Sequence, residues 1–331
     1  MKVVLAIDGG GSRTRCLAID PNGRVLGHAE SGPSNHLLIN VDIVRRSLSE
    51  AIGDALSSSG LNNDAVACVS AGLAGVDFDG ADAPQMESLL NDLGFDNLAI
   101  NGDMVIAHAG ALQSRPGVVA LAGTGSVTLG IGSDGRRVKI GGWGPIYGDE
   151  GSAYRIGQMA LRAAARAYDG RGTATGLTDA LLSALGLTNF RETVTRVYVQ
   201  RMEPREIAAL ARVAYDVAEA GDEVARCLFT TAADELAHSV EAAAQQLRMD
   251  ADDLFVSYQG SVLESCRLLH ERFVEQLKRS LPRATVVVPE FEPVIGAYLL
   301  GCNALGWPFD EGVRDQLKRT LKGQRCLSRN T

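Results

Sequence analysis

Apolar runs and amphipathic stretches alternate along the first third of the chain. Residues 3–7 form a buried-strand run that ends in a glycine turn at 8–12, and an Asn-Gly dipeptide separates two further strand segments at 16–19 and 25–26. That dipeptide is a strong hairpin signal. Apolar spacing and turn residues then predict five more elements, namely a helix at 43–56, a strand at 65–71, a helix at 84–93, a strand at 98–101 and a helix at 104–112. The order predicts an α/β fold.

The opening pattern recurs further along the chain. Residues 118–122 run into Gly123-Thr124-Gly125-Ser126, and 127–129 lead to an Asp-Gly turn at 134–135. The match of strand, turn, serine and second turn indicates a duplicated unit, one copy in each of two domains. We expect the two glycine turns to face each other across a cleft.

The rest of the chain is predicted to be mainly helical up to residue 254. Beyond it we expect a strand pair near 254–257 and 285–288 and helices at 294–305 and 311–321. These elements predict a first domain at 1–115, a second domain with a helical insert at 116–310, and a C-terminal helix at 311–331 that packs back on the first domain.

Composition limits the class of protein. The chain has 331 residues, 46% of them hydrophobic, and 40 acidic against 32 basic residues without a basic cluster. This excess of acids argues against nucleic acid or an anionic membrane as partner. No apolar run is long enough for a membrane span or a signal peptide, and six cysteines without a C-x-x-C pair indicate neither disulfides nor zinc. We expect a cytoplasmic protein.

The first glycine turn is a candidate phosphate site. No Gly-Lys pair occurs, so a P-loop is absent, and a G-x-G-x-x-G match at 130–135 precedes a strand where a dinucleotide fold needs a helix. Gly9, Gly10 and Gly11 after a strand would expose backbone N–H groups to phosphate oxygens. Asp8 could hold Mg²⁺ through water. The alternative is a tight hairpin with a solvated aspartate; the turn at 123–126 favours phosphate, as a second such cradle.

Two further segments carry candidate chemistry. Asp103 follows a strand and precedes a helix, where it can meet a ligand or cap the helix. Glycines surround Trp143, and Asp149 and Glu150 precede a helix that one of them is expected to cap. The glycines suggest backbone contact with a small hydroxylated ligand. The histidines show no metal spacing, and only His36 lies near a candidate site.

Five motifs together resemble those of the N-acetylglucosamine kinase family, within the BadF/BadG/BcrA/BcrD ATPase group of the superfamily that includes actin, sugar kinases and heat-shock chaperones. They are DGGGSRT at 8–14, GPSNHLL at 32–38, NGD at 101–103, AGTGS at 122–126 and GGWGPIYGDEGSAYRIG at 141–157. The resemblance implies two ribonuclease-H-like domains with an interdomain cleft, in agreement with the repeat.

The resemblance also implies residue roles. The glycine turns would bind ATP, with Ser12 and Thr124 at its phosphates, and Gly260-Ser261 resembles the adenosine loop. Asp103 takes the place of the catalytic base. The sugar site would comprise Asn35, Asp103, Ser126, Gly142, Trp143, Gly144 and Asp149. Two departures stand out: Ser12 replaces the usual threonine, and Leu37 replaces a tryptophan of the animal enzymes, which leaves the choice of amino sugar open.

The principal hypothesis is an ATP- and Mg²⁺-dependent kinase that phosphorylates the 6-hydroxyl of N-acetylglucosamine, or of glucosamine or another hexose. A second hypothesis is an ATPase activator of an iron–sulfur reductase, which would need converging cysteines. A third is a non-catalytic nucleotide-binding or filament-forming protein, against which the segment at 141–157 counts. Homodimers are common in the family that the chain resembles.

Overall fold

The computed structural model describes residues 1–77, 79, 82–250 and 253–327, with the side chains of 322–327 left out. The chain forms two compact units. The first unit contains residues 1–115 and the segment that begins at Pro289, and the second unit contains Pro116–Val288.

The first unit is built on a five-stranded sheet in the order β3-β2-β1-β4-β5. Its strands are β1 (Val3–Gly9), β2 (Thr14–Ile19), β3 (Val25–Ser31), β4 (Val66–Leu73) and β5 (Leu98–Gly102). The hairpins β1–β2 and β2–β3 are antiparallel, whereas β1, β4 and β5 are parallel. A short 3-10 turn, Asn63–Ala65, leads into β4.

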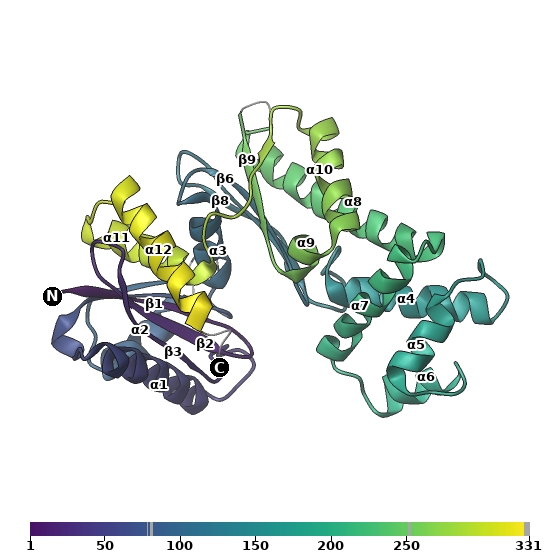
Figure 1. Ribbon diagram of the computed structural model, residues 1–331, viewed down its shortest axis with the longest axis horizontal. Coiled ribbons are helices and arrows are strands. Elements are labelled where there is room, and N and C mark those ends of the chain that lie inside the picture. Colours follow the sequence, from purple (N-terminus) through teal and green to yellow (C-terminus); the bar gives the residue numbers. More distant parts are fainter. Residues whose placement is uncertain (78, 80–81, 251–252, 328–331) are drawn as a thin grey trace. The chain divides into compact units, whose positions relative to one another are not determined.

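Helices cover both faces of this sheet (Figure 1). One face packs on α1 (Val41–Ser59) and α2 (Ala83–Asp92), and the other on α3 (Asp103–Leu112), α11 (Pro293–Leu305) and α12 (Glu311–Leu327). Helix α1 begins where the Asn40 side chain accepts a hydrogen bond from the Asp42 N–H, and it ends at Gly60 in the left-handed conformation. Caps at both ends account for the sharp limits of this helix.

The second unit repeats the sheet topology. Its sheet has the order β10-β9-β6-β7-β8, with antiparallel pairs β6–β7 and β7–β8 and parallel pairs β6–β9 and β9–β10. The strands are β6 (Gly117–Ala122), β7 (Ser126–Ile131), β8 (Arg137–Gly141), β9 (Phe255–Gln259) and β10 (Thr285–Val286). Matching strand orders confirm the predicted duplication, and the G-x-G-x-x-G match at 130–135 lies in the β7–β8 hairpin, as expected.

Helices fill the segment between β8 and β9, as predicted. They are α4 (Ala153–Tyr168), α5 (Leu177–Leu185), α6 (Glu192–Val194), a π-helical turn (Thr195–Val199), α7 (Pro204–Glu219) and α8 (Glu223–Leu247), and α9 (Ser261–Ser265) and α10 (Arg267–Ser280) follow β9. Helix α8 packs on β6, β7 and β8. The same helix therefore lines the sheet beside the second glycine turn.

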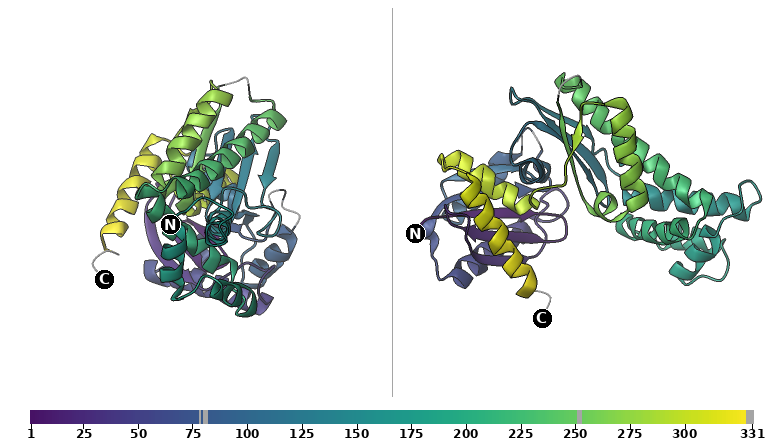
Figure 2. Two further views of the ribbon diagram at one scale, coloured as in Figure 1. Left: turned by 90° about the vertical axis from the view of Figure 1, so that its right-hand side faces the viewer. Right: turned by 45° about the horizontal axis from the view of Figure 1, so that its top comes forward.

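The predicted boundary at residue 310 is wrong, because the second unit ends at residue 288. Helix α11 buries Ile295 and Tyr298 with Val4 and Ala6 of β1, in the first unit. Helix α12 packs back on the same unit, as predicted, and Figure 2 shows α11 and α12 lying over its strands. The apolar surface of α11 thus belongs to the first sheet, although α11 follows the second sheet in the chain.

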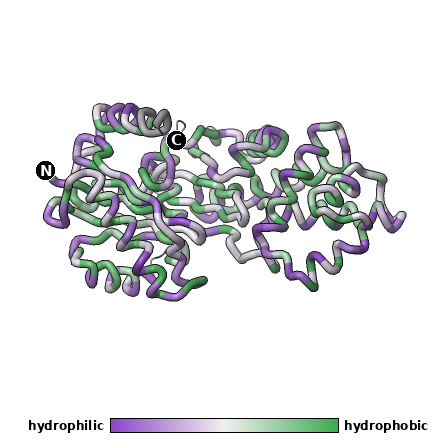
Figure 3. Tube along the Cα trace, turned by 60° about the horizontal axis from the view of Figure 1, so that its bottom comes forward, coloured by the Kyte–Doolittle hydropathy of each residue, from purple (hydrophilic) through white to green (hydrophobic). Residues whose placement is uncertain are grey.

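Each unit has its own core. One hydrophobic cluster draws all its residues from 118–286, and the other two draw theirs from the first unit. Figure 3 shows hydrophilic and hydrophobic positions alternating along the outer helices, as expected of helices with one buried face. Within the described part of the chain, no helix combines the length and the apolarity needed to cross a membrane.

Candidate functional site

Three parallel strands of the first unit end at one edge of the sheet. Gly9 of β1 lies opposite Leu73 of β4, and Leu73 lies opposite Gly102 of β5. This register brings Asp8 and Asp103 to the same edge. In open α/β sheets, ligands bind at the carboxyl ends of the strands.

The glycines of the first turn differ in what they do. A Cβ on Gly9 would overlap the Ser34 hydroxyl, whereas a Cβ on Gly11 would meet nothing within 4 Å. The Gly10 N–H donates to the carbonyl of Arg13 at 2.8 Å. The expectation of three available N–H groups is therefore wrong for Gly10, because the turn uses that donor itself. Gly11 and Ser12 form the exposed tip.

Asp8 lies in a network of charges. Burial raises the pKa of Asp8 to about 6; Arg15 opposes this shift, and the nearby carboxylate of Asp103 adds to it. Arg15 donates to Glu292 at 2.7 Å and lies 3.3 Å from Glu30. Sequence reasoning missed Glu292, because 277 residues separate it from Arg15 and no local pattern connects them.

Asp103 is the first residue of α3, and its Oδ1 accepts a hydrogen bond from the Met104 N–H at 2.8 Å. Gly102 occupies the N-cap position, so the alternative of Asp103 as N-cap residue is wrong. The carboxylate nevertheless lies in the first turn of α3, at the positive end of the helix dipole.

Asn35 lies beside the loop that follows β4. Its Oδ1 accepts from the Leu37 N–H at 3.1 Å, and a Cβ on Gly75 would stand 2.8 Å from the same oxygen. A Cβ on Gly102 would stand 2.5 Å from the carbonyl of Val76. Residues 75–76 therefore separate Asn35 from the end of β5, where Asp103 begins α3.

The second glycine turn is fixed by the start of α4. Ala153 and Tyr154 donate their N–H groups to the carbonyls of Gly123 and Thr124 at 2.9 and 3.1 Å. A Cβ on Gly123 would meet nothing within 4 Å. The carbonyls of this turn therefore face α4, while Gly123 leaves open space as Gly11 does.

Asp149 is held against the second turn. A Cβ on Gly125 would stand 3.0 Å from both Asp149 carboxylate oxygens, and the Ser126 N–H donates to Asp149 Oδ1 at 3.3 Å. Burial raises the pKa of Asp149. Its φ of 59° lies in the left-handed region, which few residues other than glycine, asparagine and aspartate adopt. Backbone and side chain are thus both constrained.

The expectation that Asp149 or Glu150 caps α4 is wrong. Ser152 is the N-cap residue, and its hydroxyl accepts the Arg155 N–H at 3.1 Å. The carbonyl of Glu150 instead accepts a hydrogen bond from Ser126 Oγ at 2.6 Å. Asp149 is consequently not needed to start the helix.

Glycines shape the segment around Trp143. Gly142 and Gly144 have φ values of 71° and 80°. These values lie in the left-handed region, which glycine adopts more readily than residues with a side chain. The Trp143 side chain is 66% exposed and stacks on Tyr147, with ring centroids 6.4 Å apart. The exposed faces of these two rings could therefore contact a ligand bound to the second unit.

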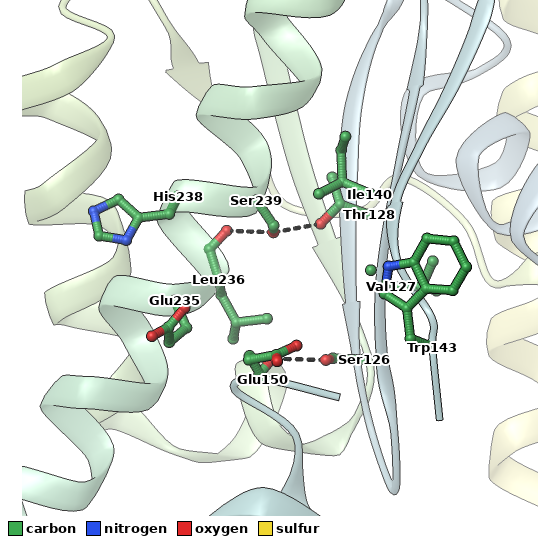
Figure 4. Close-up of a pocket in the computed structure, with 11 residues that line it drawn as sticks. Ser126, Val127, Thr128, Ile140, Trp143, Glu150, Glu235, Leu236, His238 and Ser239 are labelled. Atoms are coloured by element: carbon green, nitrogen blue, oxygen red, sulfur yellow. Dashed lines mark hydrogen bonds between the residues drawn. The ribbon is translucent and has the colours of Figure 1, made fainter. Parts of the chain in front are cut away.

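A cavity of about 410 Å³ lies between the β7–β8 hairpin and α8 (Figure 4). It is lined by Ser126, Val127, Thr128, Ile140, Gly141, Trp143, Glu150, Glu235, Leu236, His238 and Ser239. Two of the predicted sugar residues, Ser126 and Trp143, belong to this lining. The α8 side chains were missed, because an amphipathic helical pattern does not reveal which sheet edge the helix approaches.

The predicted adenosine loop lies beside the second turn. Gly260 has a φ of 100°, and a Cβ there would overlap the carbonyl of Ala122, the residue before Gly123. Ser261 is exposed at the start of α9. The second unit thus brings Gly260-Ser261 and Gly123–Gly125 together.

Apart from the proposed magnesium ligand Asp8, the described residues offer neither a metal site built from several side chains nor a set of cysteines that could hold an iron–sulfur cluster. Among the residues that the structure describes, no group of three His, Cys, Asp or Glu side chains converges on a metal position. Four described cysteines are buried, and Cys227 is exposed. A converging set of thiolates is therefore not present in the described part of the chain.

Comparison with known proteins gives concordant matches. The model of the BadF/BadG/BcrA/BcrD ATPase family matches residues 5–301. The chain is 32% identical to an N-acetylmuramic acid/N-acetylglucosamine kinase of Clostridium acetobutylicum (91% of this chain, 98% of the relative) and 29% identical to an N-acetyl-D-glucosamine kinase of Dictyostelium discoideum (92% and 98%). A solved structure, of a proposed N-acetylglucosamine kinase from Chromobacterium violaceum, has a TM-score of 0.74 at 27% identity and covers 91% and 99% of the two chains.

Proposed function

The chain belongs to the BadF/BadG/BcrA/BcrD ATPase family, and on that premise we propose that it is an ATP-dependent sugar kinase acting on the 6-hydroxyl of an amino sugar, N-acetylglucosamine first of all. The names of its relatives support this reading. The observation that carries the proposal is the meeting of Asp8 and Asp103 at one sheet edge, beside the exposed tip at Gly11 and Ser12.

The nucleotide would be bound by the two glycine turns. A side chain at Gly11 or Gly123 would meet no protein atom within 4 Å, and glycine lets the backbone approach phosphate closely. The N–H of Gly123 donates to the carbonyl of Gly125 at 2.9 Å, so at this position the turn offers space and not a free donor. Ser12 and Thr124 add hydroxyls to the same turns. Gly260-Ser261, next to the second turn, is the proposed adenosine contact.

Asp8 fits a magnesium ion. Mg²⁺ in phosphoryl-transfer sites keeps several waters and uses one or two carboxylates together with substrate phosphates. Asp8 offers one partly buried carboxylate beside a second, Asp103, and their mutual repulsion favours a cation. When bound, the ion would neutralise charge on the phosphate oxygens.

The proposed mechanism is direct phosphoryl transfer. Asp103 accepts the proton of the sugar 6-hydroxyl while that oxygen attacks the γ-phosphorus; the bond to ADP breaks, and ADP leaves. Asn35, Ser126 and Asp149 would hold the sugar hydroxyls, and the backbone at 142–144 would contact its substituents. Phosphoryl transfer depends mainly on such positioning and on charge stabilisation.

Glucosamine or another hexose remains an alternative substrate for the same residues. The iron–sulfur activator is disfavoured, because four of the described cysteines are buried and could not reach a cluster shared at a surface.

An ADP-release assay with a panel of sugars tests the proposal, and NMR of the product identifies the phosphorylated oxygen. Asp103→Asn should lower kcat by about 10²–10⁴-fold, the usual contribution of a general base. Asp54→Asn, on the exposed side of α1, is the matched control and should retain activity. The proposal fails if no sugar stimulates ADP release, or if Asp103→Asn turns over normally.

A further inference from the structure

The cavity of the second unit extends from proposed sugar-binding residues to a helix that the proposed mechanism does not use. Ser126 and Trp143 line it on the side of the β7–β8 hairpin, and Glu235, His238 and Ser239 line it from α8 (Figure 4). Its volume of about 410 Å³ lies within the range of small-molecule pockets. It therefore has room for the substituents of a sugar whose ring contacts Ser126 and Trp143.

The carboxylates that line this cavity have no lysine or arginine beside them in the lining. They belong to Glu150 and Glu235. Within the described residues, neither glutamate forms a salt bridge. The Ser239 hydroxyl already donates to the carbonyl of Leu236 at 2.7 Å and lies 2.7 Å from Thr128 Oγ1, so these hydroxyls are engaged with one another.

Two carboxylates at a polar cavity select by charge. They accept hydrogen bonds from hydroxyl, amide and ammonium groups, but they repel a carboxylate. Both glutamates are exposed, so water screens their repulsion of a carboxylate on the sugar. In water, two like charges about 4 Å apart repel by about 1 kcal/mol, which would weaken binding of an anionic sugar about fivefold for each glutamate.

We propose that Glu150 and Glu235 determine the substrate class of the enzyme, by admitting neutral amino sugars to this cavity and disfavouring anionic ones. The decisive pair of substrates is N-acetylglucosamine and N-acetylmuramic acid, which differ by an ether-linked lactyl group that carries a carboxylate. The inference rests on the proposed kinase function and on the sugar position at Ser126 and Trp143.

The test compares kcat/KM for the two sugars in the wild type, Glu235→Gln, Glu150→Gln and the double variant. Glutamine keeps the size of the side chain and removes the charge. We expect the wild type to favour N-acetylglucosamine. Each single variant should shift the ratio towards N-acetylmuramic acid by about fivefold, and the double variant should shift it further.

Glu223→Gln is the matched control. It removes the same charge from the same helix at a side chain that is 82% exposed and outside the cavity, so the ratio should not change. Equal use of the two sugars by the wild type, or an unchanged ratio in the glutamine variants, would overturn the inference while leaving the kinase function intact.

A failure of the kinase function would be seen separately, as the absence of ADP release with every sugar. In that case equilibrium binding of the two sugars, measured by calorimetry on the same variants, decides the inference. Preferential binding of N-acetylglucosamine that weakens in the glutamine variants supports it. Preferential binding of N-acetylmuramic acid, or no binding of either sugar, overturns it.

Discussion

Two glycines of the first turn are needed for different physical reasons. Gly9 is required by packing, because a side chain there would overlap Ser34, whereas the space beside Gly11 is open. Neither residue has a positive φ, so backbone strain does not distinguish them. The difference separates a structural glycine from one that we assign to the nucleotide.

Gly9→Ala and Gly11→Ala should therefore fail in different assays. Gly9→Ala should lower the free energy of unfolding by about 1–3 kcal/mol through overpacking. Gly11→Ala should change it by less than about 1 kcal/mol and raise KM for ATP, since a methyl group would stand where a phosphate approaches. Urea unfolding and ATP titration measure the two effects; equal losses of stability would contradict the distinction.

Asp149 makes stability depend on pH. Burial raises its folded-state pKa above the ordinary 3.8, so the folded protein holds this proton more tightly than the unfolded chain. Its contribution to stability therefore falls as pH rises from about 3.8 through the folded-state pKa. Asp149→Asn should remove this loss and become more stable relative to the wild type as pH is raised from 4.5 to 8.

The comparison variant is Asp149→Ala. Asparagine tolerates the φ of 59° and can still accept the Ser126 N–H, whereas alanine does neither well. Alanine should therefore be the less stable of the two variants at every pH. Urea unfolding of both variants and the wild type at pH 4.5 and pH 8 checks these predictions. An alanine variant as stable as the asparagine variant would contradict the role of the backbone conformation. An asparagine variant that loses stability relative to the wild type at pH 8 would contradict the role of the buried charge.

Residue-scale prediction from the sequence succeeded where chemistry is local. The position of Asp103 after a strand and the glycine turns were readable, because turn and strand signals lie within a few residues. The pairing of Arg15 with Glu292 was not, since it depends on how α11 docks. Ser152 as cap of α4 was also missed, because Asp149, Glu150 and Ser152 lie within four positions and leave the cap position ambiguous.

At the scale of elements, the crossing of α3 and α11 positions the proposed base. A Cβ on Gly296 would overlap the carbonyl of Ile106, and a Cβ on Gly110 would stand 2.7 Å from the carbonyl of Glu292. Phe291 also donates its N–H to the Gly110 carbonyl at 3.1 Å. Small residues on both helices permit this close approach, which fixes the helix that begins with Asp103.

Gly296→Ala should force the two helices apart. We expect a loss of about 1–3 kcal/mol in the unfolding free energy of the first unit, together with a lower kcat from displacement of α3. Gly53→Ala is the control: Gly53 lies exposed on α1, where an added Cβ would meet nothing within 4 Å, and alanine there should stabilise by about 0.5–1 kcal/mol. Thermal unfolding of both variants tests the contrast, which is refuted if they behave alike.

Most elements were predictable because their apolar positions repeat with the period of a strand or a helix. Helix α11 was predicted as a helix but placed in the wrong domain. Its buried residues lie on most of its faces, among them Val294, Ile295, Ala297, Tyr298 and Leu299. An apolar pattern on nearly all faces of a helix predicts that the helix is buried, but it does not indicate against which sheet.

At the scale of the whole molecule, the second unit is an insertion into the first. The chain leaves the first unit after residue 115 and returns at 289, and Glu290 donates its N–H to the carbonyl of Ala111 at 3.1 Å. The two ends of the insertion therefore connect to neighbouring points of the first unit. An insertion of this kind can fold alone if its core is complete.

The second unit should fold on its own as residues 116–288, since its hydrophobic cluster contains no residue outside that range. The same segment extended to residue 310, the boundary that sequence alone suggested, carries α11 without the sheet that buries it. We expect 116–288 to be monodisperse with a cooperative thermal transition, and 116–310 to aggregate through Ile295, Tyr298 and Leu299. Size-exclusion chromatography and circular dichroism measure both properties.

The complementary fragment controls for the position of the cut. Residues 1–115 joined to 289–331 by a short Gly/Ser linker keep α11 and α12 on their own sheet, and the Ala111–Glu290 hydrogen bond shows that the linker has little distance to span. This fusion should fold, whereas 1–115 alone should expose the face of β1 that α11 covers. If 116–310 were the better-behaved fragment and the fusion failed to fold, α11 would belong with the second unit after all.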